Sequence, residues 1–142
     1  MIDQLRAYKS AQEKRKSLQD QARSIGIDEA FISTLVDRFY ERVRADAELG
    51  PVFERTLEDR WDSHLANMKR FWTSIALRVE CYSGKPVEAH RRLTEAKPEH
   101  FSRWLSLFQE TLQAIAPNPQ VEEYFMASAR SIGRRLAEAM SA

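Results

Sequence analysis

The sequence has 142 residues, a length that normally forms one domain and gives a helical chain enough apolar surface for a core. Hydrophobic residues make up 43% of it and charged residues 30%, which fits an ordinary globular protein and excludes a disordered or fibrous one. Its 22 Lys and Arg are interspersed with 21 Asp and Glu, giving a net charge of +1, so we expect no nucleic-acid partner.

Cysteine content and terminal residues bear on the compartment. Cys81 is the only cysteine, which excludes an intramolecular disulfide and any cysteine cage for zinc or an iron–sulfur cluster. The N-terminus alternates charged with polar residues and lacks the apolar stretch of a signal peptide. No run approaches the roughly 20 apolar residues that cross a bilayer. We therefore expect a cytoplasmic protein without a membrane partner.

Residues 1–24 differ from the rest of the chain. Leu5, Tyr8, Leu18 and Ala22 form a sparse apolar stripe among many charges. This pattern predicts a helix that packs moderately against the remainder. The chain shows no internal repeat and no low-complexity linker. We therefore divide it into an N-terminal helical extension, residues 1–24, and one domain, residues 25–142.

From residue 25 onward, apolar residues recur every three or four positions, as on one face of an α-helix. Asp28 is placed to cap the first of five expected helices. The expected stripes are Ile32, Leu35, Val36, Phe39, Tyr40 and Val43; Trp61, His64, Leu65, Met68, Phe71, Trp72, Ile75 and Val79; Val87, His90 and Leu93; Phe101, Trp104, Leu105, Phe108, Leu112 and Ile115; and Val121, Tyr124, Phe125, Ile132, Leu136 and Met140. No segment shows sustained strand alternation, so we expect an all-α fold of helices packed on helices.

Prolines mark the expected helix ends. Pro86, Pro98 and Pro119 each precede a helical pattern, consistent with proline at a first helical position. Pro51, within residues 49–53, is expected to end a helix and turn the chain.

Common catalytic motifs are absent from the sequence. It has no glycine-rich phosphate loop, no Gly-x-Ser-x-Gly, no His-Glu-x-x-His and no Glu-x-x-His. The missing Glu-x-x-His argues against a ferritin-like di-iron centre, which uses that motif in pairs.

Two histidines stand inside apolar stripes. His64 lies between Trp61 and Met68, and His90, 26 residues later, lies in the short stripe after Pro86. Each could be a core histidine bonded to a backbone carbonyl. A turn between them could instead bring the two helices face to face, with room for a flat ligand between the imidazoles.

Aromatic residues crowd the middle of the chain, which by helical spacing alone is typical of an aromatic core. Tyr40 and Trp104 weaken that interpretation, because each carries a polar hydrogen that needs an acceptor when buried. A bound diatomic ligand is one candidate acceptor.

Several short strings together resemble the third group of truncated haemoglobins, found mainly in bacteria. The strings are FYERVR at 39–44, LGPVF at 49–53, WDSH at 61–64, FW at 71–72, YSGKPVEAH at 82–90 and HFSRWLSLF at 100–108. Their order and spacing match the family over about residues 28 to 140. The glycine-pair motifs of the first two groups are absent, as expected for the third. The family core does not require the N-terminal extension.

The resemblance implies the truncated two-over-two helical globin fold with haem b. His90 matches the proximal iron ligand, whereas Tyr40, His64 and Trp104 match positions on the distal side, where gas binds. The haem-pocket residues that we expect are Phe39, Phe53, Met68, Phe71, Trp72 and Arg91. Arg91, with its neighbour Arg92, could pair with a haem propionate or be solvated.

Function follows from the resemblance as a set of alternatives. Bound oxygen carries partial negative charge on its outer atom, so donors from Tyr40 and Trp104, worth about 1 to 3 kcal/mol, would slow its release about tenfold to a hundredfold. Slow release favours oxygen or nitric-oxide chemistry, or peroxide reduction, with an external reductase. The alternatives are a non-catalytic gas-binding or sensing module acting through a partner, and a helical interaction protein without a cofactor. The gas ligands expected are O2, NO and CO.

Three side chains keep open roles at this stage. His64 could donate to the ligand, act as a gate, line the entry route or ligate iron. His100 is expected at the surface or beside a propionate. Cys81 is expected to be a buried small residue, not a redox centre.

Overall fold

The structure, a computed structural model, describes residues 2–79 and 98–141, and within them the chain forms six α-helices and no strand. The helices are α1 (Ile2–Ser24), α2 (Glu29–Ala45), α3 (Leu49–Leu57), α4 (Trp61–Ala76), α6 (Pro98–Ile115) and α7 (Pro119–Ser141). The short helix expected after Pro86, with Val87, His90 and Leu93, lies outside the described residues.

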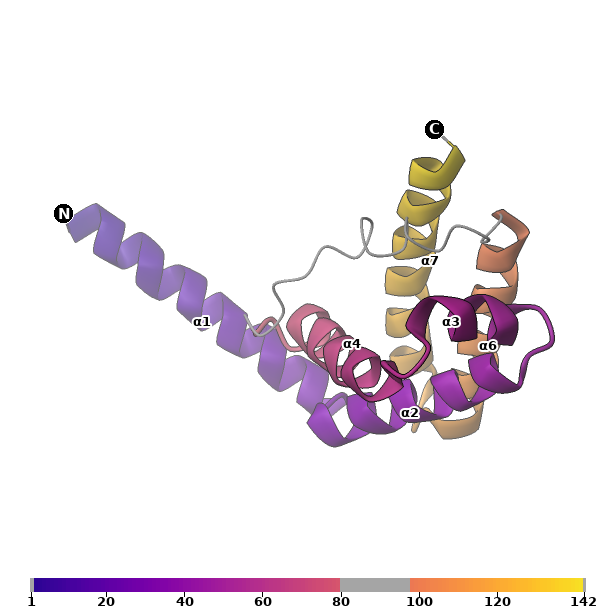
Figure 1. The fold of residues 1–142 in the computed structure, drawn as a ribbon. Helices are drawn as coiled ribbons and strands as arrows, with labels where there is room; N and C mark the ends of the chain where they lie inside the picture. Colours follow the sequence, from indigo (N-terminus) through magenta and orange to yellow (C-terminus); the bar gives the residue numbers. More distant parts are fainter. Residues whose placement is uncertain (1, 80–97, 142) are drawn as a thin grey trace.

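Helix α2 is the centre of the packed body. It contacts α3, α4 and α6, and α6 in turn packs along α7 (Figure 1). The pair α2 and α4 and the pair α6 and α7 make the two-over-two arrangement that the resemblance implied. Phe39, Phe108 and Phe125, from three of these four helices, are almost fully buried. None of the described helices is both long and apolar enough to cross a membrane.

Local caps explain where the packed helices begin. Asp28 caps α2, as predicted, because its carboxylate accepts a hydrogen bond from the amide of Phe31 at 2.8 Å. Asn118 plays the same part at α7, accepting from the Val121 amide at 3.0 Å while its own amide donates to the carbonyl of Ile25 at 2.7 Å. Pro98 and Pro119 are the first residues of α6 and α7, which confirms the predicted helix starts.

The prediction for Pro51 is wrong. Helix α2 already ends at Ala45, and Pro51 lies in the first turn of α3, where a missing N–H costs nothing. Asp46 makes the turn instead: its carboxylate accepts from the amides of Glu48 at 3.1 Å and Leu49 at 2.9 Å. A Cβ at Gly50 would lie 2.7 Å from the carbonyl oxygen of Arg44, so only glycine allows α3 to approach the end of α2 this closely.

The second predicted stripe is also too long by its last residue. Helix α4 ends at Ala76, and Leu77 completes its buried face. Val79 lies beyond the helix and is 39% exposed, so it does not belong to the core.

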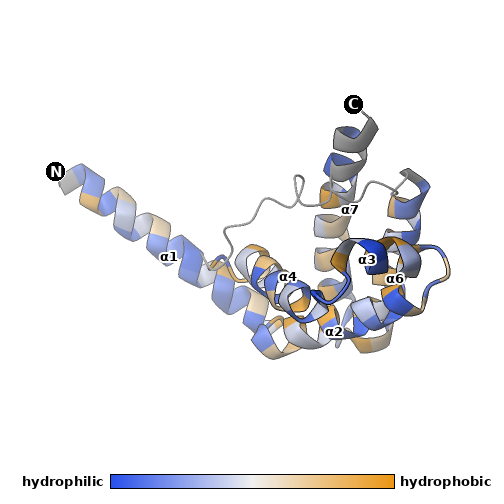
Figure 2. Cartoon of the chain, in the orientation of Figure 1, coloured by the Kyte–Doolittle hydropathy of each residue, from blue (hydrophilic) through white to orange (hydrophobic). Residues whose placement is uncertain are grey.

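Helix α1 forms as predicted but is less packed than predicted. Leu5 and Tyr8 are 56% and 61% exposed, and the helix projects from the body as a single rod (Figure 1). Figure 2 shows that most of its surface is hydrophilic. Contact with the body begins near Leu18, and the Gln19 amide donates to the carbonyl of Leu77 at 2.7 Å. Too few apolar residues face the body to anchor the first four turns.

Candidate functional site

Four ring side chains from three helices form a largely buried cluster, which we call the polar cage: Tyr40 from α2, Phe53 from α3, and Trp61 and His64 from α4. The imidazole of His64 meets the ring of Tyr40 edge-on, with centroids 4.9 Å apart and planes at 87°. The Trp61 centroid lies 6.1 Å from each of these two rings. Phe53 stacks on Trp61 at 6.3 Å. The cage therefore combines an apolar lining with hydroxyl, imidazole and indole groups.

Three other rings are stacked face to face, and we call them the ring stack: Trp72 from α4, and Trp104 and Phe108 from α6. Trp104 and Phe108 are nearly parallel, with planes at 4° and centroids 5.7 Å apart. Trp72 also stacks on Phe108, with ring centroids 5.2 Å apart and planes at 18°. Trp72 and Phe108 are buried, whereas Trp104 is half-buried. This arrangement is that of an aromatic core.

Phe39 joins the two clusters. Its ring lies 4.9 Å from Tyr40 in the cage and meets Trp104 and Phe108 in the stack edge-on, at 5.6 and 5.1 Å. Of the three predicted distal residues, the structure therefore brings Tyr40 and His64 together and connects Trp104 to them through Phe39. Their roles toward a ligand remain predictions.

The other predicted haem-pocket residues lie on inward faces of the same helices. Met68 and Phe71 are each 9% exposed, and Phe71 packs edge-on against Trp72 at 5.4 Å. His100 is half-buried in the first turn of α6, which fits neither of its expected places better than the other. His90, Arg91, Arg92 and Cys81 lie outside the described residues.

Asp46 links the helices that carry the two clusters through its hydrogen bonds. Asp46, whose side chain is only 6% exposed, accepts hydrogen bonds from Arg103 of α6 at 2.8 Å as well as from the first amides of α3. Burial alone would raise the pKa of the Asp46 carboxyl, but the hydrogen bonds from Leu49, Arg103 and Glu48 outweigh it and hold the pKa below its ordinary value. The helix that carries Phe53 is thereby tied to the helix that carries Trp104.

Trp61 is predicted from the sequence only as a member of an apolar stripe and not as a site residue, yet it belongs to the polar cage. The ring is 6% exposed, and its Nε1 is buried without a hydrogen-bond partner among the described residues. Arg44 covers the ring, with its guanidinium carbon 4.5 Å from the ring centroid, and donates to Glu54 at 3.2 Å. The spacing of three between Trp61 and His64, which puts both on one helical face, was the available signal.

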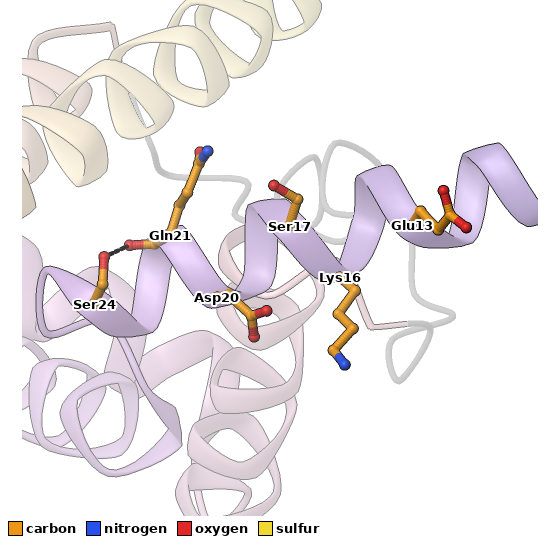
Figure 3. A pocket seen from close by; sticks show the side chains of 6 residues that line it. All are labelled: Glu13, Lys16, Ser17, Asp20, Gln21 and Ser24. Carbon is orange, nitrogen blue, oxygen red and sulfur yellow. Dashed lines mark hydrogen bonds between the residues drawn. The ribbon is translucent and has the colours of Figure 1, made fainter.

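One surface pocket lies beside Tyr40 and another lies on α1. One, of about 280 Å³, opens between α2 and α4 and reaches Tyr40 and Leu65 past the charged side chains of Asp37, Arg38 and Glu41. The other is lined by the polar residues Glu13, Lys16, Ser17, Asp20, Gln21 and Ser24, all on α1 (Figure 3). Its side chains point out along one helix, and Ser24 donates to the carbonyl of Gln21 at 2.6 Å. Only the first pocket leads to the polar cage.

The described residues fit the distal half of a haem site. A flat apolar cofactor needs buried apolar side chains, which Phe39, Phe53 and Met68 supply. A polar ligand needs inward donors, which Tyr40 and the orphaned N–H of Trp61 can supply. The predicted proximal ligand, His90, lies outside the described residues.

Comparison with known proteins agrees with this fold. A model of the bacterial-like globin family matches residues 23–138, and the chain belongs to that family. The chain is 34% identical over 109 residues to the group 3 truncated hemoglobin ctb of Campylobacter jejuni, an alignment that covers 75% of this chain and 85% of that relative. The crystal structure of group III truncated hemoglobin from Campylobacter jejuni matches with a TM-score of 0.75 and 30% identity, over 80% of this chain and 91% of that one.

These matches confirm the resemblance to the third group and the all-α globin fold. Globins bind diatomic gases on haem, so haem-based gas binding is the function class of this chain.

Proposed function

We propose that the chain binds haem b through His90 and takes O2, NO and CO in the polar cage, where it carries out oxygen or nitric-oxide chemistry. One observation carries the proposal: Tyr40 and His64 meet edge-on at 4.9 Å inside a lining that is otherwise aromatic. A hydroxyl and an imidazole beside the rings of Phe53 and Trp61 serve a polar ligand better than they serve packing, because packing would favour two apolar rings.

The side chains divide the work. Haem, when bound, would supply an iron that takes up a small ligand. Tyr40 would donate a hydrogen bond from its hydroxyl to the outer atom of a bound gas, and Trp104 would be a second donor through its indole N–H. The rings of Phe39, Phe53 and Trp72 exclude water, which strengthens each donor. We assign Arg91 to a haem propionate.

The chemistry that suits slow ligand release is oxidation of nitric oxide. Combining NO with O2 to give nitrate consumes one electron for each turnover, and an external reductase supplies it. Peroxide reduction would need the same source. We place the reaction in the cytoplasm, in keeping with a single cysteine.

A spectroscopic experiment tests the first part of the proposal. The purified protein, titrated with haem, should give visible spectra in the ferric, ferrous and carbon-monoxide-bound states that are typical of a histidine-ligated globin. With a reducing system, it should then consume nitric oxide at a steady rate. Consumption that stops after one equivalent despite excess reductant would leave gas binding and remove the catalysis.

A second candidate is a non-catalytic gas-binding or sensing module, and α1 favours it. The exposed Leu5 and Tyr8 on a projecting helix offer a surface on which a partner could sense the state of the cage. A steady turnover of nitric oxide that needs only the reductase would exclude this candidate as the main role.

A further inference from the structure

The indole of Trp61 is a buried donor for which residues 2–79 and 98–141 provide no acceptor. Its Nε1 has no accessible surface and no hydrogen-bond partner among the described residues, although the ring stands in the first turn of α4. Leaving a buried N–H unpaired costs about 1 to 3 kcal/mol, and native proteins keep few such groups. The position therefore calls for an acceptor that belongs to the working form of the protein.

The neighbours of Trp61 limit where that acceptor lies. Arg44 covers the ring from the solvent side, and a guanidinium has donors but no acceptor. Phe53, stacked at 28°, offers only a ring face. The remaining ring neighbours are Tyr40 and His64, each 6.1 Å away by centroid. The ring of Trp61 is thus in direct contact with the two predicted distal side chains.

We propose that the Trp61 N–H is a further donor of the polar cage, and that it donates to an oxygen atom held between Trp61, Tyr40 and His64. The acceptor is the outer atom of a bound diatomic ligand, or the water molecule that occupies the same space in its absence. This inference rests on the proposed function, because it assigns the ligand of the same site. Arg44, locked to Glu54 at 3.2 Å, is a positioning residue that holds the indole in its orientation.

The sharpest test removes the N–H and keeps the shape of the side chain. Site-specific replacement of Trp61 by 3-benzothienylalanine puts sulfur where the indole has N–H. Oxygen dissociation should become about tenfold faster, the loss of about 1.4 kcal/mol, while carbon monoxide dissociation changes by less than about twofold because bound CO is less polar. Trp61→Phe should show the same contrast on top of a general packing change.

Phe53→Leu is the matched packing control. It loosens the same cluster without touching a donor, so it should change the two dissociation rates by a similar factor. Arg44→Gln should raise oxygen dissociation by a smaller factor than the Trp61 replacement, because the N–H remains but its ring is less firmly held.

A second readout is independent of gas release. With indole nitrogens labelled, the Trp61 N–H resonance should lie further downfield in the oxygen complex than in the carbon monoxide complex, and it should exchange with solvent slowly in the former. The benzothienyl variant identifies the resonance by its absence.

The outcomes separate the two proposals. Failure of the parent protein to bind haem would overturn both. Normal haem binding with equal changes for oxygen and carbon monoxide in the benzothienyl variant, and an unmoved N–H resonance, would overturn the role of Trp61 and leave the proposed function standing.

Discussion

The polar cage and the ring stack lie on either side of Phe39, yet their rings meet differently. In the stack, Trp104 and Phe108 are nearly parallel, as large apolar surfaces are when packing decides their geometry. In the cage, Tyr40 and His64 meet at 87°, and the indole N–H of Trp61 is buried with no hydrogen-bond partner in the described part of the chain. Helical spacing treats both sets as core. By this difference in geometry, we expect the stack to contribute mainly stability and propose ligand binding for the cage.

The most drastic way to break this contrast is to remove the predicted iron ligand. His90→Ala should purify largely without haem, so the cage would lose its ligand function and become packing like the stack. Unfolding temperature should fall as well, because a bound cofactor stabilises only the folded state. Haem content per chain and the ferrous spectrum measure the effect, and a normal ferrous spectrum would disprove the proximal assignment.

The stack should dominate stability. Phe108 is 1% exposed and touches both tryptophans of the stack as well as Phe39, so Phe108→Ala should lower the free energy of unfolding by about 3 to 5 kcal/mol. Denaturant unfolding of the haem-free protein gives this number without interference from the cofactor. Tyr40→Phe is the control from the cage, with an expected cost below about 1 kcal/mol. Similar costs for the two variants would remove the distinction.

The link that Asp46 makes between α3 and α6 can be weakened by removing one charge. Asp46→Asn should cost about 1 to 2 kcal/mol, because a buried carboxylate that pairs with the partly exposed guanidinium of Arg103 becomes a neutral amide. The Asp46 pKa is held below its ordinary 3.8 in the fold, so the parent gains this stability above about that pH and loses it as the pH falls through the lowered folded pKa.

Unfolding curves between pH 2 and 7 measure this difference. The parent and the Asn variant should converge at the acid end and separate above pH 4 by the full amount. A constant separation at every pH would assign the cost to hydrogen-bond geometry and not to charge.

Trp104 offers the finest test, since it belongs to the stack by geometry and to the ligand side by prediction. Trp104→Phe should speed oxygen release a few-fold more than carbon monoxide release, a smaller contrast than the roughly tenfold expected for Tyr40→Phe, because water competes at a half-exposed ring. Ligand-replacement kinetics on both gases give the ratio. Equal changes would make Trp104 a packing residue and leave the donor role to the cage.

Periodicity was enough to predict α2, α4, α6 and α7, because each buries one face, and Asp28 and Pro119 mark helix starts by local chemistry. It did not predict the short helix α3 (Leu49–Leu57). It failed at two places. Pro51 lies in the first turn of α3, because the turn that precedes the helix is made by Asp46, which accepts a hydrogen bond from the Leu49 amide. Leu5 and Tyr8 have helical spacing but no surface to pack on, and the sequence of α1 alone does not indicate this.

The candidate site shows the same limit. Tyr40 and His64 could be chosen from residue type and family strings, but their edge-on contact joins two helices and is a property of the fold. The unpaired N–H of Trp61 is harder still to predict from the sequence, because it requires that no neighbouring side chain or carbonyl of the described residues accept its hydrogen bond. Asp46 and Arg103 are 57 residues apart in the chain, and nothing local to either indicates their pairing.

The projecting helix also governs how the molecule moves through water. At 1.5 Å per residue, the 23 residues of α1 form a rod about 34 Å long, comparable to the diameter of the body itself. A rod attached at one end adds frictional drag out of proportion to its mass. The monomer should therefore elute from a sizing column ahead of a sphere of equal mass, and only a mass measurement that is insensitive to shape would distinguish it from a compact dimer.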